Sequence, residues 1–333
     1  MPPLSVGLVG AGMMARIHLS AWLELGARVG VHSDDGRAGE MTGDPAHAEA
    51  VSTLAELLSR YEIIDICTPT FTHKDLILAA VEAGRHVICE KPLARTAAEA
   101  RRVVKAAEAA NVRLLPAHVV RFFPAYAAMA DAVRSGEIGE PAVLRFTRAG
   151  AYPVWSPWFA DPALSGGILV DQMIHDFDLA RLAAGEVTQV HAQARGVLQP
   201  PAPPGSVAAA TAVLTHASGA ISHVHGEWGV PGTPFRTTFR IAGAQGLLEH
   251  DSVVASTFRV AAQPRDGAGI PGPDGLAESP YLIELREFAQ VITGASPSRV
   301  TAADGLAAVR IAAAAAESAA TGRAITLAGE GER

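Results

Sequence analysis

The first 117 residues alternate between short apolar segments and segments with the apolar spacing of helices. The apolar segments occupy residues 4–9, 29–31, 63–67, 87–89 and 113–115. Helical patterns separate them, and Thr53 with Glu56 and Thr96 with Glu99 have the spacing of capping boxes. Strands that alternate with helices form a parallel sheet. The sequence therefore predicts an α/β fold that begins with a doubly wound parallel sheet, in a first domain of residues 1–119.

A glycine-rich turn joins the first apolar segment to the first helical one. Gly10, Gly12 and Ala15 have the G-x-G-x-x-A spacing, with Met13 and Met14 inside the motif. The first glycine permits a tight turn, and the second lets the backbone approach a pyrophosphate at the helix N-terminus. Ordinary strand-to-helix turns can show the same spacing. The position at the start of a β-α series favours a dinucleotide-binding site.

The residues after the second apolar segment bear on which dinucleotide is bound. An acidic side chain there binds the ribose 2′-hydroxyl of NAD, whereas a nearby arginine accommodates the 2′-phosphate of NADP. Ser33 with Arg37 favours NADP, and Asp34 favours NAD. A simple polar turn is compatible with either cofactor, so the sequence leaves the choice open.

Lys91 follows the fourth apolar segment, in the run Glu90-Lys91-Pro92. Ligands of open parallel sheets bind at the carboxyl ends of the strands. We therefore expect Lys91 to point at a ligand. The alternative is a surface lysine before a loop proline, and the glycine turn argues against it because that turn brings a nucleotide to the same edge of the sheet.

The pattern changes after residue 117. A helical segment at 124–134 precedes segments in which polar and apolar residues alternate, including 189–195 and 235–241. Such alternation is typical of antiparallel strands with one packed face. The sequence predicts a second, α+β domain of residues 120–333 with a large, mostly antiparallel open sheet. Further helices are expected at 281–292 and 302–320, and the Gly/Pro-rich residues 264–280 are expected to form a loop.

Composition limits the classes of partner and location. The chain has 333 residues and a formal net charge of −7, without the clustered Lys and Arg of a nucleic-acid groove. The first residues lack the pattern of a secretory signal, and the alanine-rich stretch 307–320 carries two charges. Cys67 and Cys89 are too few for a disulfide framework. We expect a cytoplasmic protein that binds a small molecule and neither nucleic acid nor a membrane.

Several of these motifs occur together in one known family. The order Gly10-Ala11-Gly12, Cys67-Thr68-Pro69-Thr70-Phe71-Thr72-His73, Glu90-Lys91-Pro92 and Asp171 with His175 resembles that of the Gfo/Idh/MocA family of NAD(P)-dependent oxidoreductases. The resemblance implies a Rossmann domain followed by an α/β domain with an open sheet, activity on sugars, inositols and related polyols, and homodimers or homotetramers.

The resemblance also implies roles for particular residues. It places Thr68, Pro69, Thr70 and His73 along the cofactor, and Glu90 and Lys91 near the nicotinamide. Arg121 matches a substrate-pocket position of the inositol dehydrogenase branch. The chain departs from the commonest pattern at Ser33, where many relatives carry an acid.

Three polar residues are expected to share one face of a helix that starts near Gly166 and Gly167. Asp171, His175 and Asp178 have the spacing i, i+4 and i+7. Because histidine titrates near neutral pH, we expect His175 to act as the general base that removes a hydroxyl proton as hydride leaves the carbon. Asp171 is expected to orient His175 or hold a substrate hydroxyl, Lys91 to bind the reacting oxygen, and Asp178 to bind a further hydroxyl.

The residues of this helix allow two other interpretations. Half of a metal site would need a third ligand at motif spacing, which the sequence lacks, so no metal is predicted. A solvent-facing polar stripe is the other. Trp155 and Trp158 precede the helix and either stack on the C–H face of a sugar or pack a linker onto the core.

The sequence therefore predicts an oxidoreductase that transfers a hydride between NAD or NADP and a hydroxyl or keto carbon of a sugar, inositol or related polyol. The alternative is a non-catalytic nucleotide-binding sensor or regulatory protein of the same fold. Lys91, Asp171 and His175 argue against the sensor, because a sensor has no need of proton transfer.

Overall fold

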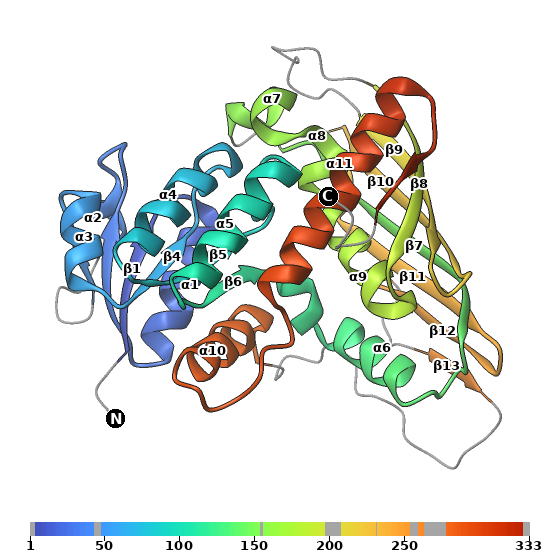
Figure 1. Cartoon of the computed structure of the whole chain (residues 1–333), viewed down its shortest axis with the longest axis horizontal. Helices are drawn as coiled ribbons and strands as arrows, with labels where there is room; N and C mark the ends of the chain where they lie inside the picture. The colour runs from blue at the N-terminus through green and yellow to red at the C-terminus, as the bar shows by residue number, and fades with distance from the viewer. Residues whose placement is uncertain are drawn as a thin grey trace. The chain divides into compact units, whose positions relative to one another are not determined.

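The computed structural model describes residues 4–42, 48–153, 156–196, 208–230, 232–253, 259–262 and 278–328. These residues cluster into two units (Figure 1). The first unit contains the residues up to Phe122 together with Glu278–Leu306, and the second contains the remainder. Trp155 and most of the predicted 264–280 loop lie outside the described residues.

The first unit is built on a six-stranded parallel sheet with the order β3-β2-β1-β4-β5-β6. Its strands are β1 (Ser5–Val9), β2 (Arg28–His32), β3 (Ala48–Ala50), β4 (Ile63–Ile66), β5 (His86–Glu90) and β6 (Leu114–Ala117). Its helices are α1 (Met13–Glu24), α2 (Ala38–Met41), α3 (Leu54–Arg60), α4 (Thr70–Glu82), α5 (Ala97–Ala109) and α10 (Pro280–Ile292), with the 3₁₀ helix η1 (Val119–Phe122). The predicted doubly wound sheet is confirmed. The sequence missed β3, which has only three residues.

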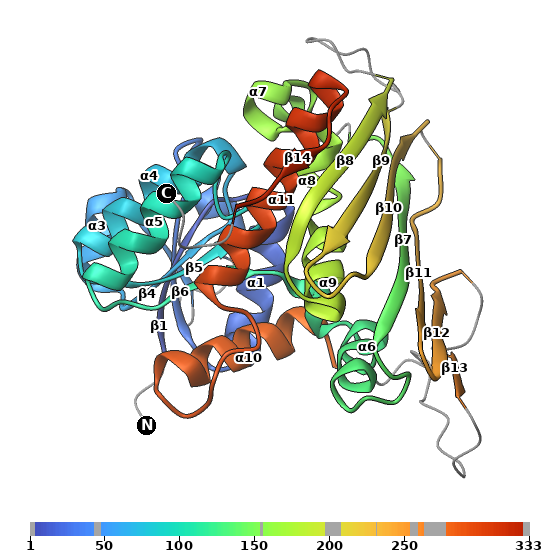
Figure 2. The same ribbon diagram turned by 45° about the vertical axis from the view of Figure 1, so that its right-hand side comes forward.

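Alternate residues of β1 pack against helices on opposite faces of this sheet. Val6 and Leu8 belong to the apolar core that contains Ala15 and Trp22 of α1. Gly7 faces Leu57 of α3 on the other side, and α3, α4 and α5 lie together there (Figure 2). Thr96 and Glu99 form the predicted capping box at the start of α5. At α3, only the Thr53 half of the predicted box forms, because the Glu56 carboxylate binds Arg60 instead.

Helix α10 belongs to the first unit, although residues 123–277, which precede it in the chain, belong to the second. Its residues Leu282, Leu285 and Phe288 are buried in the core that contains β1, β2 and α1, and Phe288 makes an edge contact with Phe122. The division of the structure therefore differs from the sequence-based division at residues 119 and 120, which put residues 278–306 in the second domain. An amphipathic pattern shows that a helix has an apolar face, but it does not show which surface that face covers.

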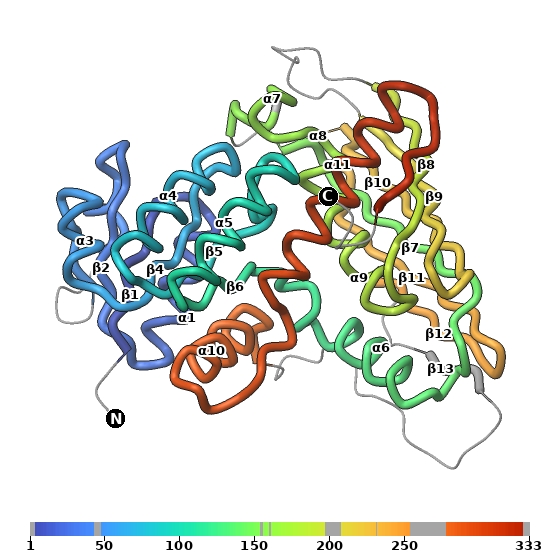
Figure 3. Tube along the Cα trace, in the orientation of Figure 1, coloured from blue at the N-terminus to red at the C-terminus, as the bar shows by residue number. Residues whose placement is uncertain are grey.

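The second unit contains an eight-stranded mixed sheet with the order β13-β12-β11-β7-β10-β9-β8-β14. The chain can be followed through it in Figure 3, where β7 lies between β10 and β11. Only the β7–β10 pairing is parallel among these described strands. The strands are β7 (Pro141–Ala151), β8 (Val187–Arg195), β9 (Ala208–His216), β10 (Ile221–Gly229), β11 (Arg236–Gly243), β12 (Gly246–Asp251), β13 (Arg259–Ala262) and β14 (Ile325–Thr326).

The two faces of the second sheet differ in burial. In β8, Val190 and Ala192 are buried, whereas Gln189, His191 and Gln193 are exposed. This confirms the predicted mostly antiparallel sheet with one packed face. The other elements of the second unit are α6 (Pro124–Arg134), η2 (Pro157–Ala160), α7 (Pro162–Ser165), α8 (Gly167–Asp171) and α9 (Ile174–Ala184). Helix α11 (Ala302–Thr321) is shared, because its residues up to Leu306 belong to the first unit and the rest to the second.

The predicted continuous helix through Asp171, His175 and Asp178 is wrong. It consists of α8 and α9, which are separated at Gln172 and Met173. The amide of Met173 donates to the carbonyl of Ile168, five residues earlier, so one extra residue is inserted in the turn. The i, i+4 relation between Asp171 and His175 therefore does not hold across this break.

None of the helices in the described part of the chain is both long and apolar enough to span a bilayer.

Candidate active site

Gly10 makes the turn that follows β1. Its φ angle is +117°, and a Cβ atom at this position would lie 2.5 Å from the carbonyl oxygen of Cys67. Its amide donates to the carbonyl of His32 at 2.8 Å. Glycine is required here, because another residue would be strained and would collide with the backbone after β4.

Gly12 begins α1 without a side-chain cap. A Cβ atom at Gly12 would meet no atom within 4 Å, so the space in front of the first turn is open. Met13 beside it is 59% exposed, whereas Ala15 is fully buried where the helix crosses the sheet. Uncapped N–H groups with open space in front of them fit the pyrophosphate of a dinucleotide.

The residues after β2 form an acidic turn. Asp34 is exposed, and its carboxylate lies 3.3 Å from Nε2 of His32. Arg37 is held by Asp35, to which its Nε donates at 2.7 Å. The hydrogen bond from Arg37 lowers the pKa of Asp35 to about 2, so this carboxylate is ionised at physiological pH. Arg37 is thus paired within its own turn.

His73 joins the segments after β4 and β5. It is 1% exposed, with Nδ1 lying 2.7 Å from the carbonyl oxygen of Pro92 and Nε2 lying 2.9 Å from that of Thr68. A neutral imidazole has one N–H and donates to one of these acceptors, whereas a protonated ring donates to both. Burial lowers the pKa of His73. The resemblance placed His73 along the cofactor, and the structure shows its ring supporting two backbone segments.

The other residues predicted after β4 are ordered by local hydrogen bonds. The hydroxyl of Thr72 donates to the carbonyl of Pro69 at 2.8 Å and lies 2.7 Å from the hydroxyl of Thr68. Thr70 is buried and opens α4. These contacts fix the turn at the carboxyl end of β4, beside the turn at Gly10.

Glu90 ends β5 and turns its side chain into the protein. It is 7% exposed, and its Oε2 accepts the amide hydrogen of Lys91 at 3.0 Å. Its Oε1 lies 3.4 Å from Nε2 of His18. The Glu90 side chain therefore contacts the main chain of Lys91. The peptide bond between Lys91 and Pro92 is cis.

His18, on α1, connects two buried carboxylates. Its Nδ1 lies 2.9 Å from Oδ2 of Asp65, which also accepts from Nε1 of Trp22 at 2.7 Å. Burial alone would lower the pKa of His18, but Asp65, which pairs with Nδ1, outweighs it and raises this pKa well above its usual value. His18, Asp65 and Cys67 are of the residue types that bind metals. The 2.9 Å contact is a hydrogen-bond distance, which fits a shared proton rather than a cation between the two side chains.

Glu284 lies beside this group, on α10. It is fully buried, and neither carboxyl oxygen has a hydrogen-bond partner among the described residues. Burial raises the pKa of Glu284 well above its usual value, although His18 opposes this shift. Burial therefore favours the protonated form of Glu284 over its carboxylate.

The substitution Glu284→Gln is expected to stabilise the protein more at high pH than at low pH. The unfolded chain releases a proton above pH ~4.3, while the native protein retains it until the raised pKa is reached, so native stability falls with rising pH in that interval. The glutamine variant avoids this loss. We expect thermal unfolding to show a rise in Tm of roughly 3 °C at pH 8 and less at pH 5. Equal shifts at both pH values would contradict the explanation.

Arg121 is used inside the first unit. Its side chain is almost fully buried, its guanidinium donates to the carbonyl of Arg299 at 2.7 Å, and it lies 3.4 Å from Asp304. These contacts tie η1 to the segment before α11 and to the first turn of that helix. They favour a structural role over the substrate contact that the resemblance implied.

In the second unit, the predicted residues lie on both sides of the α8–α9 break. Asp171 ends α8, and His175 is in the first turn of α9. Asp171 and Asp178 are buried, and His175 is half-buried. The neighbouring Asp176 is fully buried and accepts two hydrogen bonds from Arg148 of β7, each 2.9 Å long. This bidentate pair fixes the start of α9 to the sheet.

Gly226 of β10 lets the helix break approach the sheet. A Cβ atom there would lie 2.5 Å from the side chain of Met173. Gln172 donates to the carbonyl of Glu227 at 3.4 Å. The position of His175 thus depends on a glycine in β10 that sequence reasoning did not single out.

Aromatic side chains gather near η2 and the ends of β7 and β10. Trp158 stacks on Phe159 with ring centroids 4.0 Å apart. Phe159 and Tyr152 each contact Trp228 edge-on. Trp158 is therefore part of an aromatic cluster that includes Trp228. Sequence reasoning missed Trp228, which lies near the end of β10.

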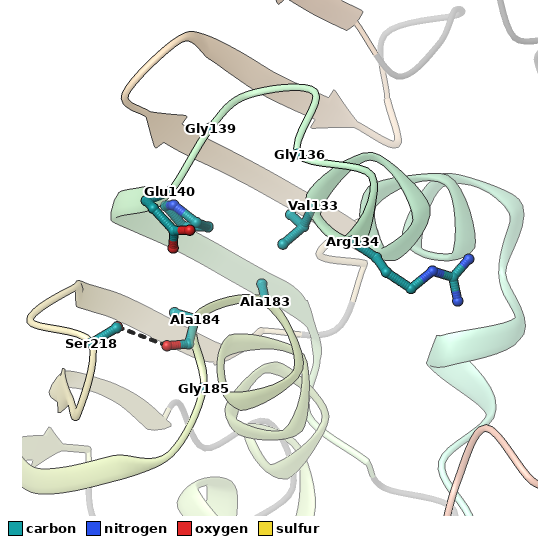
Figure 4. Close-up of a pocket in the computed structure, with 10 residues that line it drawn as sticks. Val133, Arg134, Gly136, Gly139, Glu140, Ala183, Ala184, Gly185 and Ser218 are labelled. Atoms are coloured by element: carbon teal, nitrogen blue, oxygen red, sulfur yellow. Dashed lines mark hydrogen bonds between the residues drawn. The ribbon is translucent and has the colours of Figure 1, made fainter.

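A pocket in the second unit lies elsewhere. Figure 4 shows it lined by residues at the C-terminal ends of α6 and α9, with Ser218 donating to the carbonyl of Ala184. His175 is at the other end of α9. The lining of this pocket contains none of the predicted site residues.

Comparison with known proteins decides the family. Residues 4–118 match the model of the oxidoreductase family with an NAD-binding Rossmann fold, and residues 126–249 match that of the GFO/IDH/MocA C-terminal domain. The chain is 31% identical to a D-apiose dehydrogenase of Paraburkholderia graminis, over 82% of this chain and 74% of the relative. It is 29% identical to a myo-inositol 2-dehydrogenase of Thermotoga maritima, over 91% of this chain and 92% of the relative.

The chain belongs to the Gfo/Idh/MocA family. Among solved structures, levoglucosan dehydrogenase in complex with NADH matches with a TM-score of 0.81 and 25% identity, covering 97% of this chain and 99% of that one. The first unit is thus an NAD-binding Rossmann domain, in a family of NAD(P)-dependent sugar dehydrogenases.

Within this Gfo/Idh/MocA protein, the first unit brings most of the predicted cofactor residues to one edge of its sheet. They follow four strands that are consecutive in the parallel sheet, in the order β2-β1-β4-β5. Sequence reasoning missed His18, Asp65 and Glu284 beneath this edge. The only signal was the presence of polar residues within apolar patterns.

Proposed function

We propose that the protein oxidises a hydroxyl group of a sugar or cyclic polyol, or reduces the corresponding ketone, with NAD as the hydride carrier. The observation that supports this most strongly is Lys91, whose main chain is fixed by Glu90 at the same sheet edge as the uncapped start of α1. NAD supplies hydride transfer when bound. The Gly10–Gly12 turn would hold its pyrophosphate, which fits the open space at Gly12.

The chain's own residues perform the proton chemistry in this proposal. Lys91 donates a hydrogen bond from Nζ to the reacting oxygen, and His175 takes the hydroxyl proton on its ring nitrogen. Asp171 and Asp178 bind further hydroxyls, and Trp158 offers a ring face to the C–H side of the substrate. The names of the relatives, which include inositol and apiose dehydrogenases, support a polyol or sugar.

A substrate panel tests the proposed function. The purified protein is incubated with NAD or NADP and with polyols and sugars that include myo-inositol, D-apiose and levoglucosan, and absorbance of the reduced cofactor is followed. We expect turnover with at least one member. Cofactor binding without turnover across the panel would instead support the nucleotide-binding sensor.

Size-exclusion chromatography with light scattering tests the homodimer or homotetramer that the family resemblance implies.

NAD is the preferred cofactor in this proposal. Arg37 is the one cation of this turn that the sequence suggested for binding a 2′-phosphate. Its guanidinium is already paired with the carboxylate of Asp35. The carboxylates of Asp34 and Asp35 would repel that phosphate if Arg37 were not released.

The substitution Asp35→Asn is expected to raise kcat/KM with NADP by roughly tenfold, because the freed Arg37 then pairs with the 2′-phosphate. The value with NAD should change little. Steady-state kinetics with both cofactors measure the effect. Arg37→Ala on the Asp35→Asn background is the matched control and should abolish the gain. A gain that survives this second substitution would show that Arg37 does not cause it.

A further inference from the structure

The main chain at Lys91 is held by a continuous series of buried side chains. Asp65 pairs with Nδ1 of His18 at 2.9 Å, Nε2 of His18 faces Oε1 of Glu90 at 3.4 Å, and Oε2 of Glu90 accepts the amide hydrogen of Lys91 at 3.0 Å. His18 and Asp65 are fully buried, and Glu90 is 7% exposed. Because these side chains are shielded from bulk solvent, a shift of one of them is expected to move the next.

The charge balance of this group depends on His18. Burial favours the neutral forms of Cys67, Tyr281 and Glu284, which face the same space as the side chains of Asp65 and Glu90. His18 lowers the pKa of Glu90 against the opposing effect of burial. Without a nitrogen at the position of Nε2, the buried Oε1 of Glu90 would lose the donor that faces it, and the Glu90 side chain would be expected to move toward another donor.

We propose that His18 is a positioning residue for Lys91, acting through Glu90. This inference rests on the proposed function, in which Lys91 contacts the reacting oxygen. His18 belongs to α1, so the helix that receives the pyrophosphate also sets the main chain at Lys91. A displacement of about 1 Å at a reacting group can cost about 10²-fold in rate.

Two isosteric substitutions separate the contacts of His18. In His18→Asn, the amide nitrogen replaces Nδ1 and keeps the contact with Asp65 but loses Glu90. In His18→Gln, the amide nitrogen replaces Nε2 and keeps the contact with Glu90. We expect His18→Asn to lower kcat about 10²-fold and His18→Gln to stay within about threefold of the wild type. The dissociation constant of NADH, measured by fluorescence, should remain unchanged in both, because neither touches the Gly10–Gly12 turn.

A purely structural role predicts a different result. It would lower Tm in both variants and leave kcat of the folded protein alike in the two. Equal kcat values, whether both fall or neither does, would overturn the proposal. Glu90→Gln provides a second measurement if His18→Asn does not fold. It keeps an oxygen for the Lys91 amide but weakens the pairing with His18, so kcat should fall about tenfold, and an unchanged kcat would overturn the proposal.

Lys91→Ala distinguishes failure of this inference from failure of the proposed function. If Lys91→Ala retains full turnover, the proposed function is wrong and the effects of His18 have another cause. If Lys91→Ala is inactive while His18→Asn is fully active, only the positioning role of His18 is wrong.

Discussion

Lys91→Ala is expected to lower kcat by about 10³-fold while the dissociation constant of NADH changes little. General acid–base groups contribute about 10² to 10⁴ in rate, and Lys91 is assigned to the reacting oxygen and not to the pyrophosphate. Steady-state kinetics on a substrate from the panel, together with NADH fluorescence, separate turnover from binding. His175→Ala should show the same pattern, because it removes the proposed general base.

Lys74→Ala is the matched control for the loss of a lysine. Lys74 is in α4 of the same unit and lies near Asp75 and Glu99 at 3.3 and 3.7 Å. It should retain the kcat of the wild type. If both Lys91→Ala and His175→Ala keep normal rates, the proposed chemistry is wrong. If they lose NADH binding together with turnover, their roles are in cofactor binding.

Arg148→Leu is expected to destabilise the protein by about 3–5 kcal/mol. Arg148 is 5% exposed, and it donates both hydrogen bonds that the fully buried Asp176 accepts from a side chain. Its loss leaves a buried carboxylate without a countercharge, and breaking a buried ion pair from one side has a cost of this size. Thermal unfolding followed by circular dichroism would show a fall in Tm of roughly 10 °C.

Two further variants show whether the unpaired charge is the cause. Arg148→Met combined with Asp176→Leu removes both charges and should recover most of the lost Tm. Arg240→Leu removes an arginine of the same sheet whose side chain is 57% exposed and pairs with Glu249, and it should change Tm little. A double variant as unstable as Arg148→Leu would point to packing around Arg148 instead.

Some site residues belong to short contiguous motifs that can be recognised in the sequence, whereas others depend on contacts between distant residues. Gly10, Gly12 and the Glu90-Lys91-Pro92 run are contiguous motifs at strand ends, so the sequence alone could place them at one edge of a parallel sheet. The acidic turn was visible too, but the pairing of Arg37 with Asp35 depends on side-chain geometry. Asp171 and His175 were found by a helical spacing that the inserted residue at Met173 breaks.

Residues that act through tertiary contacts gave little sequence signal. His18 and Glu284 are polar positions in helices that are far apart in the chain, and nothing local shows that both face Asp65. The family resemblance implied that Arg121 contacts the substrate. In the structure its guanidinium donates to the carbonyl of Arg299 and lies near the carboxylate of Asp304.

The sequence by itself determined the strand–helix alternation of the parallel sheet, the mostly antiparallel character of the second sheet, and the glycine turn, because periodicity and backbone requirements are properties of neighbouring residues. Only the tertiary structure decided that α10 packs into the first unit, that Gly226 admits the α8–α9 break, and that His18 lies between Asp65 and Glu90. These depend on which buried surfaces meet. A pattern of apolar residues shows that a surface is buried, but the partner is selected by close packing and by the pairing of buried charges.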